Sequence, residues 1–168
     1  MSASSLTDGE FALPDLVNYV IGPRQQSSGP SFTTNLTMIS TSELRKLAGA
    51  RIKDSQVLLA GGRFDGAVYL CGYAIELALK ARICRTLKWP GYPSTKKEFE
   101  GFLSFKIHRL DLLLTLCGQE VKIKTNYFAD WSTVAGWDPE LRYSLVGTAS
   151  RQDAIDMIDS ATTLMRVL

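Results

Sequence analysis

The stretch DGAVYLCGYAIELALKARI, from Asp65 to Ile83, decides the fold of this chain. Apolar residues cover most of the circumference that it would have as a helix, which is typical of a helix at the centre of a bundle. At 100° per residue five polar residues of the stretch fall within an arc of about 80°. We call them the polar stripe: Asp65, Tyr69, Tyr73, Glu76 and Lys80. The stretch therefore predicts a buried central helix with a single polar stripe.

The polar stripe places a carboxylate and an ammonium four residues apart on this apolar helix. A pair of Glu76 and Lys80 on one helix contributes only about 0.2–0.5 kcal/mol, which does not offset the cost of burying two charges. We therefore expect a third group from another helix, either Arg142, which can hold a carboxylate bidentately, or His108. Two interpretations stay open, a buried network that fixes helix register and a polar cleft that binds a ligand.

Helical periodicity continues through the chain from residue 40 onward. Ser40 and Glu43 have the spacing of a capping box, which predicts the start of the first helix. Glycines and prolines mark where helices end, and Ser150 is the expected N-cap of the last one. The expected helices span about 41–60, 64–87, 96–117 with a break near 104–108, 125–134 and 151–168. Because no run alternates with period two, the sequence predicts an all-α antiparallel helical bundle of about five helices.

Residues 1–40 are rich in Ser, Gly and Pro and lack this periodicity, which predicts an extended or partly disordered N-terminal arm before a bundle at 41–168. The length of 168 residues and the hydrophobic content of 45% fit one globular domain. The three cysteines lack metal-ligand spacing, which favours buried thiols in a reducing compartment. Neither a signal sequence nor a long apolar run occurs, so we expect a soluble, cytoplasmic protein without metal or cofactor.

Residues 80–124 are locally basic, with ten Lys or Arg residues against four Asp or Glu residues, although the formal net charge of the chain is only +2. One interpretation is a set of ordinary solvated helix faces. The other is a surface that attracts phosphate groups.

His108, Arg142 and Tyr143 are the candidate catalytic residues. Metal-independent RNA cleavage needs a base, an acid and a cation for the phosphorane charge. His108 could supply the proton transfer, Arg142 the charge and Tyr143 a positioned hydroxyl. We expect residues 138–143 to form a short capped helical turn that aims Arg142 and Tyr143 inward. The structural alternative is that His108 packs at a helix start, Arg142 neutralises Glu76 and Tyr143 lies in the core.

Three segments together resemble the HEPN domain family (higher eukaryotes and prokaryotes nucleotide-binding). They are GRFDGAVYLCGYAIELALKARIC at 62–84, KIHRLDLLL at 106–114 and WDPELRYS at 137–144, and the resemblance covers about residues 40–168. It implies a helical bundle that is frequently dimeric. It also implies one of several roles: a metal-independent ribonuclease of toxin–antitoxin or phage-defence systems, a partner of a minimal nucleotidyltransferase, or an inactive or nucleotide-binding member.

Ribonuclease members of that family have an arginine followed, after four to six residues, by a histidine. Arg142 matches the arginine, but residues 147–149 are Gly, Thr and Ala, and the sole histidine, His108, lies upstream. We therefore expect a non-catalytic HEPN-like module that binds a nucleotide, RNA or a partner protein, as a homodimer in a prokaryotic defence or toxin–antitoxin system. The alternatives are a metal-independent endoribonuclease that uses His108 and Arg142, and a homo-oligomeric assembly protein without a ligand.

Overall fold

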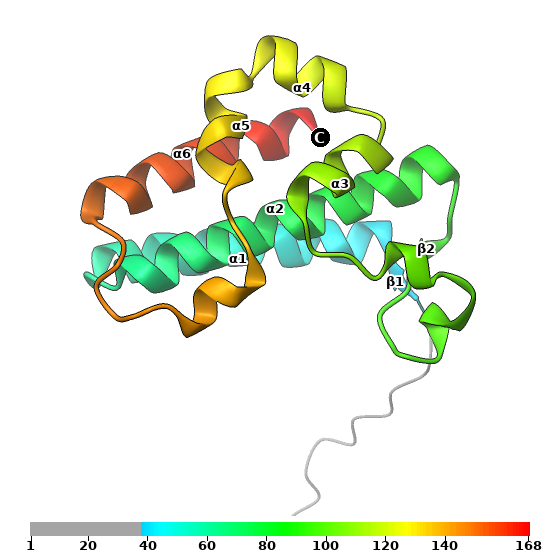
Figure 1. Ribbon diagram of the computed structural model, residues 1–168, viewed down its shortest axis with the longest axis horizontal. Helices are drawn as coiled ribbons and strands as arrows, with labels where there is room; N and C mark the ends of the chain where they lie inside the picture. The colour runs from blue at the N-terminus through cyan, green and yellow to red at the C-terminus, as the bar shows by residue number, and fades with distance from the viewer. Residues whose placement is uncertain (1–37) are drawn as a thin grey trace, which may run out of the picture. The chain divides into compact units, whose positions relative to one another are not determined.

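The computed structural model describes residues 38–168, and within them six α-helices and one short β-sheet form a helical bundle (Figure 1). The α-helices are α1 (Thr41–Ala60), α2 (Phe64–Leu87), α3 (Leu110–Leu116), α4 (Glu120–Asn126), α5 (Phe128–Ala135) and α6 (Arg151–Val167). The remaining elements are the strands β1 (Ile39–Ser40) and β2 (Gly91–Tyr92) and the 3-10 helices η1 (Glu98–Gly101), η2 (Leu103–Phe105) and η3 (Pro139–Tyr143). The predicted all-α bundle is confirmed, whereas most of the predicted arm lies outside the described residues.

The helices α1 and α2 form a long hairpin that begins and ends where the sequence predicts. The Ser40 hydroxyl accepts a hydrogen bond from the Glu43 backbone N–H at 3.2 Å, so Ser40 is the N-cap of α1. The Glu43 carboxylate does not complete a reciprocal box, because it accepts from Lys46 instead, at 3.4 Å. Gly62, at the turn into α2, has a φ of +70°, a left-handed conformation that glycine adopts without strain.

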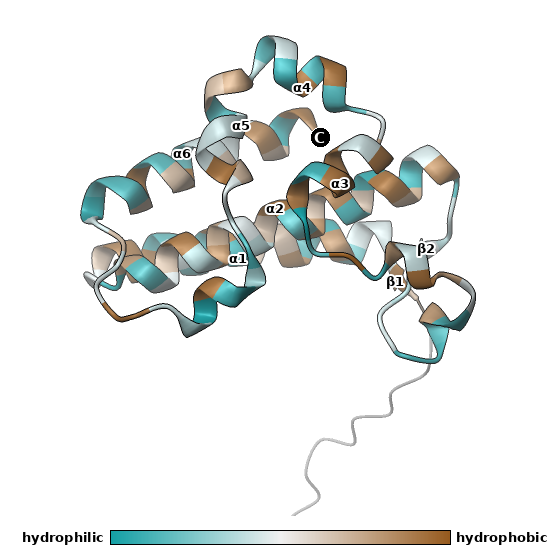
Figure 2. Ribbon diagram, in the orientation of Figure 1, coloured by the Kyte–Doolittle hydropathy of each residue, from teal (hydrophilic) through white to brown (hydrophobic). Residues whose placement is uncertain are grey.

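The helix α2 lies at the centre of the bundle, as predicted, and contacts α1, α3, α6, β2 and η3. Hydrophobic colouring extends along α2 in Figure 2, interrupted at a few positions. Gly72 on α2 packs directly against the indole of Trp137. A Cβ atom at residue 72 would lie 2.0 Å from Cγ of Trp137, so only glycine lets this indole lie against the helix.

The strands β1 and β2 form one antiparallel pair, in which Ile39 lies opposite Tyr92 and Ser40 opposite Gly91. The sequence analysis predicted no strand, because a pairing of two residues on each side is too short to show an alternating pattern. The pairing attaches Ile39 and Ser40, the last two residues of the predicted arm, to the body of the bundle.

The prediction of a helical region over 96–117 was wrong in its first half, which holds only the 3-10 helices η1 and η2 before α3 begins at Leu110. An aromatic cluster accounts for this. The Trp89 ring packs edge-on against Phe102 and Phe105, with ring centroids 5.0 and 4.8 Å apart. The Tyr92 hydroxyl donates to the Phe105 carbonyl oxygen at 2.5 Å. These tertiary contacts hold the segment in an irregular path despite its helical composition.

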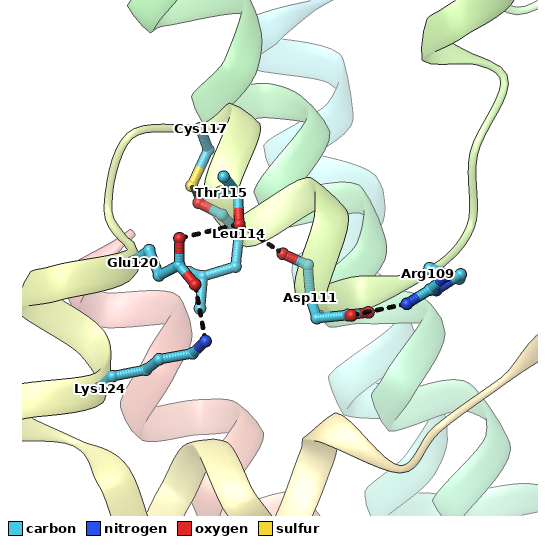
Figure 3. A network of polar contacts seen from close by, with 7 residues as sticks. All are labelled: Arg109, Asp111, Leu114, Thr115, Cys117, Glu120 and Lys124. Carbon is cyan, nitrogen blue, oxygen red and sulfur yellow. Dashed lines mark hydrogen bonds and ion pairs between the residues drawn. The ribbon is translucent and has the colours of Figure 1, made fainter.

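The predicted fourth helix over 125–134 is two helices in the structure, α4 and α5, which meet at Tyr127. The sequence analysis missed most of α4. Polar side chains tie it to α3 (Figure 3): Glu120 accepts from the Thr115 hydroxyl at 2.9 Å and from Lys124 at 2.6 Å. Gly118, with a φ of +71°, provides the turn between the two helices. The short helix α4 is thus joined to α3 at its first residue, and Ile123 is its one buried side chain.

The last helix, α6, is confirmed with Ser150 as its N-cap. Ser150 and Asp153 form a reciprocal capping box, in which each side chain accepts from the backbone N–H of the other residue.

The three cysteines are free and buried, and burial raises the pKa of the Cys71 thiol to about 11. Within residues 38–168, no helix combines the length and the apolar character that a bilayer crossing requires.

Candidate functional site

The carboxylate of Glu76 is the centre of the candidate site. Glu76 is only 2% exposed, and its Oε1 atom accepts hydrogen bonds from Lys80 Nζ at 2.5 Å and from His108 Nδ1 at 2.9 Å. The prediction of a third group that completes the Glu76–Lys80 pair is therefore confirmed. That group is His108, and Arg142, the other candidate, pairs elsewhere.

His108 reaches Glu76 from the non-helical segment before α3, whose first residue, Leu110, lies two residues after the predicted helix start at His108. Because an ionised carboxylate can only accept, the Nδ1 atom of His108 donates this hydrogen bond. In the tautomer that carries its proton on Nδ1, the Nε2 atom keeps its lone pair. The His108 side chain is 55% exposed while its anchor is buried, so the ring has a fixed orientation and an accessible edge.

Lys80 lies between the carboxylate and an aromatic ring. Its side chain is 12% exposed, and Nζ lies 5.2 Å from the ring centroid of Tyr92, a favourable cation–π distance. Burial raises the pKa of the Tyr92 phenol above its ordinary value, which keeps the hydroxyl protonated as a hydrogen-bond donor. Two neighbours that present negative charge, the Glu76 carboxylate and the face of the Tyr92 ring, therefore stabilise the ammonium group.

These residues line a cavity of about 430 Å³, which we call the site pocket. Its polar side chains include Tyr69, Tyr73, Glu76, Lys80, His108 and Arg142, and Lys106 adds a further cation at its edge. Lys80, Lys106 and Arg142 thus contribute three positive charges against the single carboxylate of Glu76. Among the ion pairs of residues 38–168, none involves Lys106. The site pocket consequently has a net positive charge.

The predicted turn at 138–143 is confirmed as η3, whose N-cap Asp138 accepts from the Glu140 backbone N–H at 2.8 Å. The predicted inward orientation is wrong for Tyr143, whose exposed fraction is 73%. Arg142 pairs with Glu140 at 3.1 Å and stacks on the Tyr143 ring, 4.7 Å from its centroid. The interpretation that Arg142 neutralises Glu76 is therefore wrong, as is a core position for Tyr143.

Arg142 nevertheless reaches the rim of the site pocket. The adjacent phenols of Tyr143 and, to a smaller extent, Tyr69 raise the pKa of the Arg142 guanidinium, which therefore stays fully charged. His108 and Arg142 also line a second hollow that adjoins the site pocket. Two of the three candidate catalytic side chains, those of His108 and Arg142, thus lie at one site, whereas Tyr143 does not line the site pocket.

The polar stripe divides into two parts with different roles. Tyr69, Tyr73, Glu76 and Lys80 line the site pocket. Asp65 instead accepts backbone hydrogen bonds from residues 147 and 149, each at 2.7 Å. These bonds, the one from residue 149 foremost, lower the pKa of Asp65 below its ordinary value. Asp65 therefore stabilises the loop before α6 and does not line the site pocket.

The residues of the site pocket that the sequence analysis missed include Tyr92, Lys106 and Trp137. Trp137 is 5% exposed and donates from its indole nitrogen to the Tyr69 carbonyl oxygen at 3.0 Å, so it is a packed residue. Its edge also closes one wall of the site pocket. Tyr92 and Lys106 belong to segments without regular periodicity, so no pattern in the sequence placed them near α2.

In the part of the chain from residue 38 onward, no three His, Cys, Asp or Glu side chains gather closely enough to hold a metal ion. Comparisons with family models, with curated proteins and with solved structures found no match to this chain. The resemblance to the HEPN family therefore stays a prediction, and the function must be argued from the site pocket itself.

Proposed function

We propose that this chain is a HEPN-like binding module whose site pocket takes a phosphate-bearing ligand, either a nucleotide or one nucleotide of an RNA strand. The observation that carries the proposal is the concentration of three cations and three tyrosine rings around one hollow beside a buried carboxylate. In this proposal the module binds its ligand without catalysing a reaction.

The charges of the site pocket support an anionic ligand. Lys80 pairs with Glu76 and Arg142 pairs with Glu140, which does not line the site pocket, but Lys106 has no such partner among the described residues. A phosphate would therefore meet a net positive potential there and could accept charge-assisted hydrogen bonds. Because Glu76 and Lys80 neutralise each other, the excess positive charge of the site pocket comes from the other two lining cations, Lys106 and Arg142.

The shape and the aromatic residues of the site pocket support a ligand with a ring. A cavity of about 430 Å³ is within the range of small-molecule sites, which begins at roughly 300 Å³. Tyr73 is 37% exposed and lines this cavity together with Tyr69. An accessible phenol ring can stack on a nucleobase, and such stacking tolerates any base. A ligand with a base and a phosphate would thus use both features.

Titration calorimetry with AMP, ATP and a five-nucleotide RNA tests this proposal. We expect Lys106→Gln and Arg142→Gln each to weaken binding by on the order of tenfold, since each removes a charge-assisted contact. Both residues are on the surface, so the fold should be retained. Lys46→Gln is the matched control, because Lys46 pairs with Glu43 on α1 and does not line the site pocket. Unchanged affinity in the Lys106→Gln/Arg142→Gln double variant would contradict the proposal.

A second candidate function, a metal-independent endoribonuclease, is favoured by the hydrogen bond from His108 to Glu76. A buried carboxylate that holds Nδ1 fixes the tautomer of an imidazole and leaves Nε2 ready to take a proton. Glu76 would then be a positioning residue for His108. Arg142, at the same rim, would stabilise the charge that develops on the phosphate.

Cleavage of a labelled RNA by the purified chain in EDTA separates the two functions. The binding proposal predicts no cleavage above background. Robust cleavage that Arg142→Ala abolishes would overturn it and support the ribonuclease. If cleavage occurs and His108→Ala leaves its rate unchanged, the ribonuclease mechanism proposed for His108 is rejected. Glu76→Gln should shift the pH profile of any His108-dependent cleavage, because it alters the hydrogen bond that orients the ring.

The proposal extends to a partner and a location. The segment after η3 exposes two large apolar residues, Leu145 at 85% and Val146 at 97%, which suits a homodimer contact or a nucleotidyltransferase partner. The buried free thiols suit the reducing cytoplasm. A defence or toxin–antitoxin role is part of the same proposal. Sedimentation of wild type and of Leu145→Ser/Val146→Ser would test the homodimer, which predicts a smaller species for the variant.

A further inference from the structure

A further hollow, separate from both the site pocket and the hollow that adjoins it, lies between α1 and α6 and measures about 440 Å³. We call it the basic groove, and the lining residues that matter are Arg45, Gly49, Lys53, Gln56, Thr162 and Arg166. Three of these are cations and none is acidic. They come from helices that are more than 90 residues apart in the sequence, so the fold rather than a local charge run creates the groove.

The three cations of the basic groove differ from their neighbours in lacking counter-charges. On the same helix α1, Lys46 pairs with Glu43 and Arg51 pairs with Asp54. No ion pair within residues 38–168 involves Arg45, Lys53 or Arg166. The sequence also places no acidic residue three or four positions from any of them. The charges of these three side chains are therefore not neutralised by ion pairs with the described carboxylates of this chain.

Gly49 lies in the middle of α1 and lines the basic groove. Glycine weakens a helix interior relative to alanine, so a packing or functional reason is expected for it there. No heavy atom lies within 4 Å of the position that a Cβ atom would occupy, so packing within the described chain does not require glycine. The missing side chain keeps the groove open for close approach of a ligand to the helix backbone.

We propose that the basic groove binds the phosphodiester backbone of a single-stranded nucleic acid, one nucleotide of which occupies the site pocket. The inference rests on the proposed function. Leu44 lines the site pocket and Arg45 the basic groove, so the two sites lie on different sides of the same turn of α1. A strand longer than a few nucleotides can therefore contact both.

The composition of the basic groove fits phosphate contacts rather than base recognition. From Arg45 to Lys53 is eight residues, or about 12 Å along a helix, which is enough for more than one phosphate. Gln56 and Thr162 add neutral donors for phosphate oxygens. No aromatic side chain lines the groove, so bases do not stack there. Binding at the groove should depend on strand length and salt but not on base sequence.

Fluorescence anisotropy with labelled 20-nucleotide poly-uridine and poly-deoxythymidine tests the inference on the full chain. We expect Lys53→Gln/Arg166→Gln to weaken binding on the order of tenfold and to lower the slope of log affinity against log salt by about 1.4, at about 0.7 per single-strand phosphate. The control is Lys46→Gln/Lys124→Gln, which removes the same charge from lysines that pair with Glu43 and Glu120. Equal losses in the two double variants would overturn the inference.

The Gly49→Ala variant distinguishes a loss of strand binding from a loss of folding, because the two quantities should change in opposite directions. Alanine has open space at this position and a higher helix propensity, so the midpoint of thermal unfolding should rise by about 2–4 °C. The affinity for the 20-nucleotide strands should nevertheless fall, and Gly49→Leu should lower it further. A variant that is more stable and binds the strands as tightly as wild type would show that the opening at Gly49 has no role in binding.

Titration with AMP separates a failure of this inference from a failure of the proposed function. If AMP binds in a manner that depends on Lys106 and Arg142 while the groove variants bind long strands normally, the basic groove is rejected and the site pocket stands. If long strands depend on Lys53 and Arg166 but AMP does not bind, the groove stands as a strand-binding surface and the pocket proposal fails. If neither strand type binds at low salt, the groove is rejected as a nucleic-acid site.

Discussion

Replacement of Gly72 by alanine tests the contact that closes the site pocket. The added Cβ atom would lie 2.0 Å from Cγ and 2.1 Å from Cδ1 of Trp137, far inside van der Waals contact, so the indole must leave α2. Its hydrogen bond to the Tyr69 carbonyl oxygen would be lost at the same time. Because Trp137 is 5% exposed, nearly all of its packing is affected.

The expected cost follows from these contacts. Truncation of a buried tryptophan to alanine costs about 3–5 kcal/mol, which is an upper bound for displacing the indole. Alanine in place of glycine within a helix offsets about 1 kcal/mol of this. We therefore expect Gly72→Ala to lower the free energy of unfolding by about 2–4 kcal/mol. Since η3 begins at Pro139, two residues after Trp137, the rim residue Arg142 should also move and ligand affinity should fall.

Urea denaturation followed by tryptophan fluorescence and by circular dichroism measures this change. The matched control is Gly49→Ala, also within a long helix, which should raise the free energy of unfolding by about 0.5–1 kcal/mol because the position is open. On a Trp137→Ala background, Gly72→Ala should no longer destabilise the fold, since the clash is gone. If Gly72→Ala alone is as stable as wild type, the packing of Trp137 on α2 is not as described.

Three further changes probe the buried pair, the loop before α6 and the cap of α6. Glu76→Ala leaves the mostly buried ammonium of Lys80 without its partner and should lower the free energy of unfolding by about 3–5 kcal/mol, part of which Glu76→Ala/Lys80→Leu should restore in the same urea assay. The pKa of Asp65 is lowered in the folded state, so its carboxylate stabilises the fold above the unfolded pKa near 3.8 and this contribution is lost as the pH falls through the folded value. The thermal midpoints of wild type and Asp65→Asn should therefore differ at pH 7 and converge towards pH 3, and a constant difference would contradict the assignment. Ser150→Ala removes the side-chain half of a capping box and should cost about 1 kcal/mol in urea denaturation, whereas Ser150→Asp should cost less.

Local patterns predicted the regular helices well. The bounds of α1, α2 and α6 follow from Ser40, from the glycines after residue 60, from the turn at 89–93 and from Ser150. Each of these signals acts within one or two turns of the helix that it ends or begins, so the sequence contains all that is needed. The segment between Trp89 and Leu110 could not be predicted in this way, because contacts among aromatic rings from separate turns decide its path.

The candidate site shows the same division between local and distant contacts. The spacing of Glu76 and Lys80 on an apolar helix was enough to predict a buried ion pair that needs a third partner. The sequence did not predict that His108 rather than Arg142 would bind Glu76. That outcome depends on where the segment before α3 and the 3-10 helix η3 lie against α2. Trp137, Tyr92 and Lys106 line the site pocket because of the same long-range packing.

The amino-acid sequence by itself determined that this chain forms a helical bundle around α2 and that one face of α2 must carry charge into the interior. Periodicity and capping are short-range properties, and they survive in any arrangement of the helices. Only the tertiary structure decided that His108 completes the Glu76–Lys80 pair, that Asp65 serves the loop before α6, and that unpaired cations of α1 and α6 face one groove. Those outcomes depend on which surfaces meet once the apolar faces are buried, and that is settled by the packing of the whole domain.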